Sequence, residues 1–182
     1  MSFARPGGAL VAALLAAAPA MAQAPHQHGH GTVNIAIERD RVVIELHAPG
    51  ADIVGFERAP QTDTEKQALA RAIEALQRPL TLVDLPAAAR CAVDEAVVAA
   101  EGMNDGAPEG AHAEFEAAWM LRCADTGALR TFDFAPLFAR FARVEEFDVT
   151  VVTARGPATY EVDRDHPTVD RGGTFWRWMT GR

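Results

Sequence analysis

Two short runs of alternating apolar and polar residues restrict the fold of this chain more than any other feature. The runs cover 32–38 and 41–47 and are separated by two residues. A period of two is typical of a strand with one buried face, and two residues form a tight hairpin loop. Pairing Glu38 with Arg41 predicts a register that places every apolar partner on one face. These partners are Val33 with Leu46, Ile35 with Ile44 and Ile37 with Val42.

A helix is predicted after this hairpin. Thr62 and Glu65 have the spacing of a capping box, with threonine at the N-cap and glutamate three residues later. Apolar residues then recur at helical spacing. The helix should end near Arg78, because the residue before Pro79 is driven out of the helical region.

A second hairpin is predicted in the middle of the chain. The Val- and Ala-rich runs 91–100 and 112–123 flank a segment rich in Gly, Asn, Asp and Pro, which indicates a loop. Pairing the two ends of this hairpin would place Val93 opposite Leu121 and Val97 opposite Ala117.

The last third of the chain predicts a short helix and two more strands. The helix lies within 132–141, and the strands lie within 145–156 and 158–162. Strands outnumber helices, so we expect an α+β fold of antiparallel β-hairpins with a few short helices packed on one side. The inward residues of the short helix are Leu137, Phe138 and Phe141.

The first 22 residues have the pattern of a secretory signal. A charged start is followed by an apolar run at 9–18 and by Ala20-Met21-Ala22, an A-x-A cleavage pattern. That run is shorter than the roughly 20 residues that span a bilayer, and nothing later is long and apolar enough. We expect a signal peptide at 1–22 and a single domain at 23–182, located in the periplasm and not spanning a membrane.

Charge and cysteine content limit the function classes. The formal net charge is −8, with one lysine, which argues against nucleic-acid binding. Cys91 and Cys123 are the two cysteines, and an even number in an exported chain indicates a disulfide. Two thiolate metal ligands are the alternative, which the lack of a CxxC spacing disfavours. The bridge would close a loop of about 32 residues.

The segment "HQHGHG" at 26–31 is the first candidate metal site. His28 and His30 lie on one side of an extended chain, about 6.6 Å apart at Cα, and the flanking glycines remove steric obstruction. The predicted register brings His47 opposite Thr32, at the end of the hairpin where this segment enters. Zinc takes four ligands. His28, His30 and His47 could supply three, with His26, Glu45 or water as the fourth.

Other interpretations of the histidines remain open. A His-rich tail can bind metals only weakly, as an affinity tag does, and His47 alone is an ordinary residue for a surface strand. His112 and Glu114 in "HAEF" are further candidate ligands, and either can equally be a solvated surface residue. His166, between Asp163 and Asp165 along the chain, is expected at the surface, with a minor acidic site as its alternative.

Catalysis is not predicted, because the chain has no H-E-x-x-H, H-x-H-x-D-H or G-x-S-x-G motif. No M-x-x-M cluster is present to indicate Cu(I) handling. Histidine ligands then favour Zn(II), with Cu(II) and Ni(II) as competitors.

Several long segments resemble the ZrgA-type periplasmic proteins, a family associated with bacterial zinc uptake. They are "HGHGTVNIAIERDRVVIELHAPGADIVGFERAP", "HAEFEAAWMLRC" and "LFARFARVEEFDVTVVT", in order from about His26 to Val162. The resemblance implies a zinc-binding accessory that works beside an ABC-type zinc importer or its solute-binding protein. The His-rich N-terminal motif of the family is matched by His26, His28 and His30.

Two departures from the family pattern limit the expected capacity for zinc. Family members carry a long His-rich loop before the H-x-E-F segment, and here "EGMNDGAPEG" has no histidine. The family's "GFEHAP" also reads "GFERAP", with Arg58 in place of histidine. We therefore expect one site, or a few ions, rather than a store of many. The alternative from another class is an envelope interaction module whose histidines are incidental.

Overall fold

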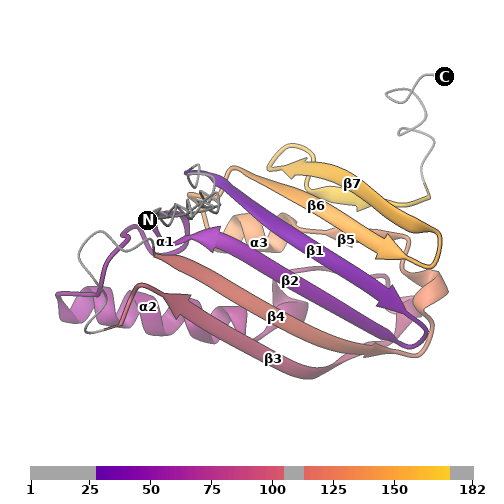
Figure 1. Ribbon diagram of the computed structural model, residues 1–182, viewed down its shortest axis with the longest axis horizontal. Helices are drawn as coiled ribbons and strands as arrows, with labels where there is room; N and C mark the ends of the chain where they lie inside the picture. The colour runs from indigo at the N-terminus through magenta and orange to yellow at the C-terminus, as the bar shows by residue number, and fades with distance from the viewer. Residues whose placement is uncertain (1–27, 105–112, 173–182) are drawn as a thin grey trace, which may run out of the picture.

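The computed structural model describes residues 28–104 and 113–172, so the expected signal segment, His26 and His112 lie outside the described residues (Figure 1). The described chain forms eight strands, three α-helices and short 3-10 turns, of which η3 spans Thr126–Ala128. The helices are α1 (Gly50–Ile53), α2 (Asp63–Leu76) and α3 (Ala135–Arg140). The strands are β1 (His30–Glu38), β2 (Arg41–Pro49), β3 (Cys91–Glu101), β4 (Glu114–Cys123), β5 (Thr131–Asp133), β6 (Glu146–Thr153), β7 (Gly156–Asp163) and β8 (Thr168–Asp170).

The first hairpin has the predicted register. Glu38 pairs with Arg41, Ile35 with Ile44, and Thr32 with His47. The alternation buries the apolar partners of β1 and β2 and leaves the intervening side chains on the other face of the sheet. The outward direction of His47 therefore follows from the local pattern.

Six strands form one curved sheet in the order β3-β4-β2-β1-β6-β7, and β5 pairs with β8 in a second, small sheet. The large sheet is antiparallel except for β1 and β6, which are parallel, with Val33 opposite Val149. The predicted α+β class is confirmed. The parallel pair was not expected, because period-two alternation identifies a strand but not its neighbour.

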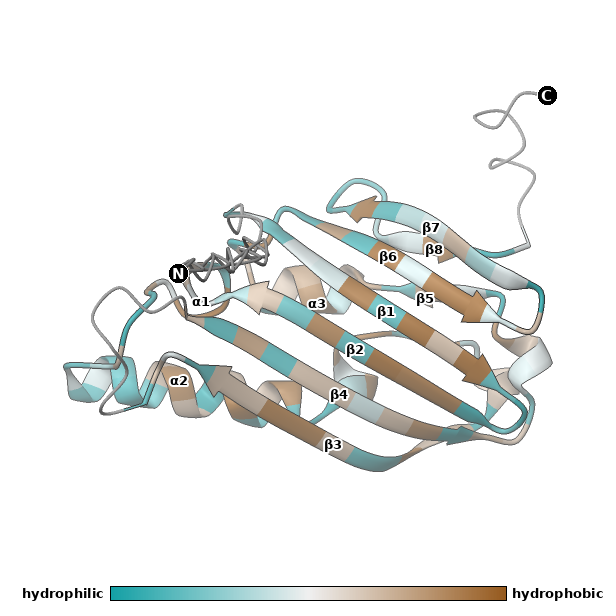
Figure 2. Ribbon diagram, viewed as in Figure 1, coloured by the Kyte–Doolittle hydropathy of each residue, from teal (hydrophilic) through white to brown (hydrophobic). Residues whose placement is uncertain are grey.

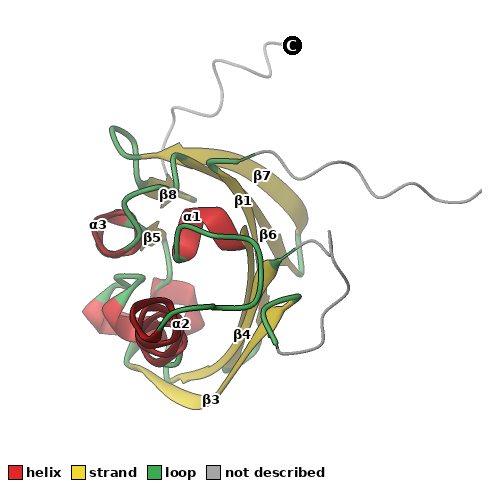
Figure 3. Cartoon of the chain, turned by 90° about the vertical axis from the view of Figure 1, so that its left-hand side faces the viewer, coloured by secondary structure: helices red, strands yellow, loops and turns green. Residues whose placement is uncertain are grey.

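All three helices pack on one side of the large sheet, as predicted (Figure 3). The capping box of α2 is present: Thr62 accepts from the backbone N–H of Glu65, whose side chain accepts from that of Thr62. The helix ends at Leu76, two residues before the predicted end. The Leu76 carbonyl accepts a buried hydrogen bond of 2.7 Å from the Trp119 indole N–H, which ties α2 to β4.

The core lies between the helices and the inner face of the sheet. Hydrophilic and hydrophobic residues alternate along β2 and β4, as expected for strands with one covered face (Figure 2). The predicted inward side of α3 is confirmed, because Leu137, Phe138 and Phe141 are buried. Phe147, from β6, packs against the Phe138 ring.

The second hairpin differs from its predicted register by one residue over most of its length. Cys91 lies opposite Cys123 and Val93 opposite Leu121, but Val97 lies opposite Ala118 rather than Ala117. The cause is a β-bulge between Val93 and Glu95, where two residues oppose one. The predicted disulfide between Cys91 and Cys123 is present, and it joins the edge strand β3 to β4.

Candidate metal site

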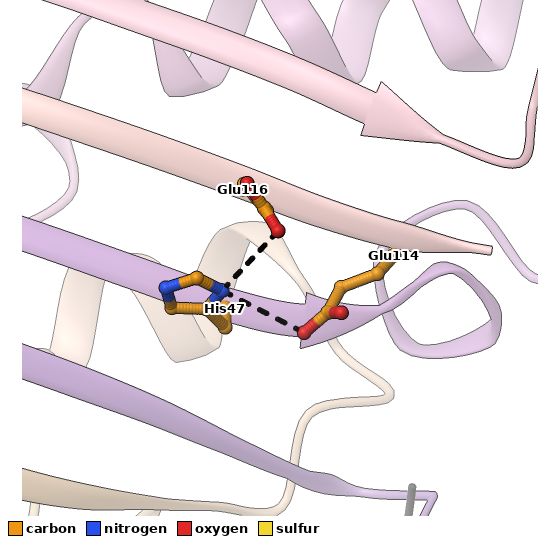
Figure 4. A group of neighbouring side chains, drawn as sticks. All are labelled: His47, Glu114 and Glu116. Carbon is orange, nitrogen blue, oxygen red and sulfur yellow. Dashed lines mark ion pairs between the residues drawn. The ribbon is translucent and has the colours of Figure 1, made fainter. Parts of the chain in front are cut away.

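One histidine and two glutamates converge on the outer face of the sheet, opposite the helices. His47 is on β2, and Glu116 lies directly opposite it on β4. Glu114 is two residues further along β4, on the same face, opposite Pro49. Both carboxylates point toward the imidazole (Figure 4), with His47 Nδ1 at 3.7 Å from Glu114 Oε1 and 3.8 Å from Glu116 Oε1. One ligand atom from each lies within 4.8 Å of the others.

This spacing suits one small divalent ion. Zinc binds nitrogen and oxygen ligands at about 2.1 Å, so two tetrahedral ligand atoms are about 3.4 Å apart. The two nitrogen–oxygen distances exceed that value by only a few tenths of an ångström. Small rotations of the glutamate side chains would close the difference. Among the described residues, this is the group of three potential ligands that meets the spacing.

The site is accessible to solvent. The side chains of His47, Glu114 and Glu116 are 37%, 22% and 48% exposed. A hollow of about 160 Å³ lies beside His47 and Glu116 and is also lined by Glu45. Three protein ligands leave a fourth position for water or a further side chain, and an ion held on this exposed face can enter and leave without opening the core.

Carboxylates surround these three residues on the outer face. On the outer face, the residues aligned across the six strands with His47, Glu45 and Pro49 include no lysine or arginine. A surface of one sign raises the local concentration of cations. We call this group the acidic band; it consists of Glu45, Glu101, Glu114, Glu116, Glu146, Asp148, Glu161 and Asp163.

The N-terminal histidines do not join His47 in one cluster within the described residues. His30 is on the outer face of β1, with its Nδ1 at 3.2 Å from Glu146 Oε1. His28 lies before the strand, with its Nδ1 at 3.5 Å from Glu57 Oε1. His26 and His112 lie outside the described residues. His166 is 83% exposed and lies 3.4 Å from Asp163, consistent with a surface residue.

Gly29 and Gly31, on either side of His30, occupy positions where the structure requires glycine. Gly29 has a left-handed φ of 84°, and its N–H donates a 2.8 Å hydrogen bond to the buried Asp52 carboxylate. A Cβ on Gly31 would lie 2.4 Å from the Phe147 ring. The "HGHG" spacing therefore fixes the path of the chain into β1, besides placing His30 on the outer face.

Substitutions at Asp52 test whether its hydrogen bond with Gly29 stabilises the fold. Burial raises the pKa of Asp52, and the hydrogen bond from Gly29 partly opposes it. A carboxyl whose folded-state pKa is raised disfavours the folded state as pH rises through that pKa. Asp52→Asn keeps an acceptor without the charge, so we expect an equal or higher melting temperature at pH 7, and a smaller difference below pH 4. Asp52→Ala should cost about 1–3 kcal/mol. Equal losses in both variants would contradict this.

Sequence reasoning missed Glu116 because it did not predict that β4 pairs with β2. The available signal was the i, i+2 spacing of Glu114 and Glu116, which puts both on one face of a strand. Arg58 pairs with Glu65 at 2.6 Å. This ion pair, with backbone hydrogen bonds, lowers the pKa of Glu65 to about 2. Arg58 therefore has a structural role beside the capping box.

A family model described as "ZrgA family zinc uptake protein" matches residues 25–171. The chain belongs to this family. No curated protein matches the chain. Membership in the ZrgA family indicates a zinc-related role, and together with the disulfide it favours an exported protein. Within residues 28–104 and 113–172, none of the helices has both the length and the apolar character needed to cross a bilayer.

Proposed function

We propose that this ZrgA family member is a periplasmic protein that captures Zn(II) on the outer face of its sheet and supports zinc acquisition. The observation that carries the proposal is the convergence of His47, Glu114 and Glu116 on one point. Imidazole nitrogen and carboxylate oxygen are both ligands that zinc uses in proteins. The signal-like segment at 1–22 and the disulfide support the periplasmic location.

Capture and release follow from the position of the site. The acidic band attracts divalent cations, and the His47 imidazole supplies the nitrogen that distinguishes zinc from Mg²⁺ or Ca²⁺, which prefer oxygen. Solvent access and an open fourth position allow a competing ligand to remove the ion. An ABC-type zinc importer or its solute-binding protein is the recipient we propose.

The N-terminal histidines are proposed as supplementary ligands. His30 lies on the strand next to β2 and shares the outer face with His47. We propose that the His30 imidazole can leave Glu146 and supply a fourth ligand. His26, His28 and His112 are proposed to extend the site toward a second, weaker ion.

The first test is a zinc titration of the untagged, signal-free chain by calorimetry, with melting temperature as a second measurement. We expect one saturable high-affinity ion and a zinc-dependent rise in melting temperature. Cu(II) and Ni(II) are titrated in parallel, because imidazole alone does not exclude them. A protein that binds none of these ions and gains no stability would contradict the proposal and favour the envelope interaction module.

The pH dependence of zinc affinity shows whether histidine side chains bind the ion. A proton competes with zinc for the imidazole nitrogen, so each histidine ligand weakens zinc binding as the pH falls from 7 to 5. We expect a clear loss of affinity over this range for a site that uses His47, and a steeper loss if His30 also binds the ion. Affinity that does not change with pH would exclude histidine from the site.

A further inference from the structure

Four arginines gather at the end of the sheet opposite the acidic band, around a cavity of about 340 Å³. They are Arg39, Arg130, Arg155 and Arg171, from four separate segments of the chain. The described residues that line this cavity include no aspartate or glutamate. Along β2, Arg41 next to this end is six residues from His47, a distance of about 20 Å. The two charged regions are therefore separate.

The four arginines line the same cavity. The arginine–carboxylate ion pairs between described residues use Arg58, Arg78 and Arg122 instead. Burial lowers the pKa of Arg171; Tyr160 opposes this, and the positive charges of Arg155 and Arg130 lower it further. Three carboxylates close along the chain also have partners: Asp40 pairs with Arg122, Asp125 accepts from the Gly127 N–H and Asp170 accepts from the Gly172 N–H.

The backbone at Arg39 is a second, independent observation. Arg39 begins the two-residue turn between β1 and β2 with a left-handed φ of 51°. Such turns favour Asn, Asp or Gly, because a larger side chain strains the backbone there. The turn is anchored by a hydrogen bond from the Thr126 hydroxyl to the Arg39 carbonyl. An arginine at a position that suits asparagine indicates a use for the guanidinium.

We infer that this cavity is a binding site for a small oxyanion with two or more negative charges, of the phosphate or diphosphate class. Planar guanidiniums bind phosphate oxygens in pairs, and several around one cavity match a multiply charged ligand. The volume is at the lower end of the range for small-molecule sites. The Arg171 side chain also donates a 2.6 Å hydrogen bond to the Leu129 carbonyl, which positions one guanidinium in advance. This inference is independent of the proposed zinc site.

The test is a calorimetric titration of the untagged chain with inorganic pyrophosphate at pH 7 and 0.15 M salt. Protein and buffer are freed of metal first, because pyrophosphate itself binds divalent cations. We expect one saturable site. Arg130→Gln with Arg155→Gln should weaken it at least tenfold. Lys66→Gln with Arg71→Gln removes the same charge from exposed positions on α2, and should change affinity less than twofold.

Arg39→Asn separates binding from folding. Asparagine tolerates the left-handed turn, so we expect an unchanged or higher melting temperature together with at least threefold weaker pyrophosphate binding. A parallel arm measures co-sedimentation with vesicles that contain phosphatidate. If the protein binds these vesicles and pyrophosphate releases it, the natural ligand of the cavity is a lipid phosphate headgroup. No saturable binding in either arm, or equal losses in the α2 and the cavity variants, would overturn the inference.

Discussion

Replacing His47 by alanine is expected to lower zinc affinity at least a hundredfold. His47 supplies the nitrogen ligand of the candidate site, and its loss leaves two glutamates with oxygen ligands alone. Carboxylates without imidazole bind zinc weakly and select poorly against Mg²⁺ and Ca²⁺. The side chain is 37% exposed on the outer face, so the substitution should change the melting temperature of the zinc-free protein little. Calorimetry and melting curves on the same sample separate these effects.

Matched variants locate the site. Glu114→Gln with Glu116→Gln keeps the size of both side chains while removing their charge, and should approach the loss in the His47 variant. His166→Ala removes an exposed histidine beside Asp163 of β7, three strands away from β2, and should change affinity less than twofold. Unaltered affinity in the His47 variant would place the ion elsewhere.

The N-terminal histidines are expected to contribute less than His47. His28→Ala with His30→Ala should lower affinity about tenfold, because in the described chain their imidazoles lie beside Glu57 and Glu146 rather than beside His47. A loss larger than that of the His47 variant would mean that the ion is held mainly by the "HQHGHG" segment.

Local pattern predicted half of this site and tertiary packing supplied the other half. The alternation in β1 and β2, with a two-residue turn, determined the register and so the outward direction of His47. Glu116 reaches His47 only because β4 pairs with β2, a contact between residues about 70 positions apart in the sequence. No local spacing records such a pairing, since many orders of the same strands bury the same apolar faces.

The errors in the predicted fold have the same origin. The register of β3 and β4 was right at Val93 and wrong at Val97, because a bulge adds a residue that alternation alone does not reveal. β6 was recognised as a strand, but its parallel pairing with β1 depends on how the chain returns across the core. The capping box, the two-residue turn and the disulfide were predicted correctly, because each is determined by a few residues that nearly always form the same local structure.

Removing the disulfide is expected to be the largest single loss of stability. Cys91 and Cys123 are 32 residues apart, and on the chain-entropy model a bridge of that span stabilises the fold by about 3–4 kcal/mol. Cys91→Ala with Cys123→Ala should therefore lower the melting temperature by about 10 °C. β3 is an edge strand whose partner in the sheet is β4, so protease cleavage should begin in β3. Reduction of the native protein should reproduce both effects.

Zinc binding should survive this loss, and that difference distinguishes the structural role of the cysteines from a role as ligands. The bridge is at the opposite end of β4 from Glu114, nine residues and about 30 Å away. Glu114 and Glu116 are aligned with His47 through β2, not through the disulfide. The folded alanine variant should bind zinc within threefold of the native affinity at 10 °C, where it remains folded. If the variant that lacks the bridge also lost zinc affinity, the edge strand β3 would be shown to help position the zinc ligands.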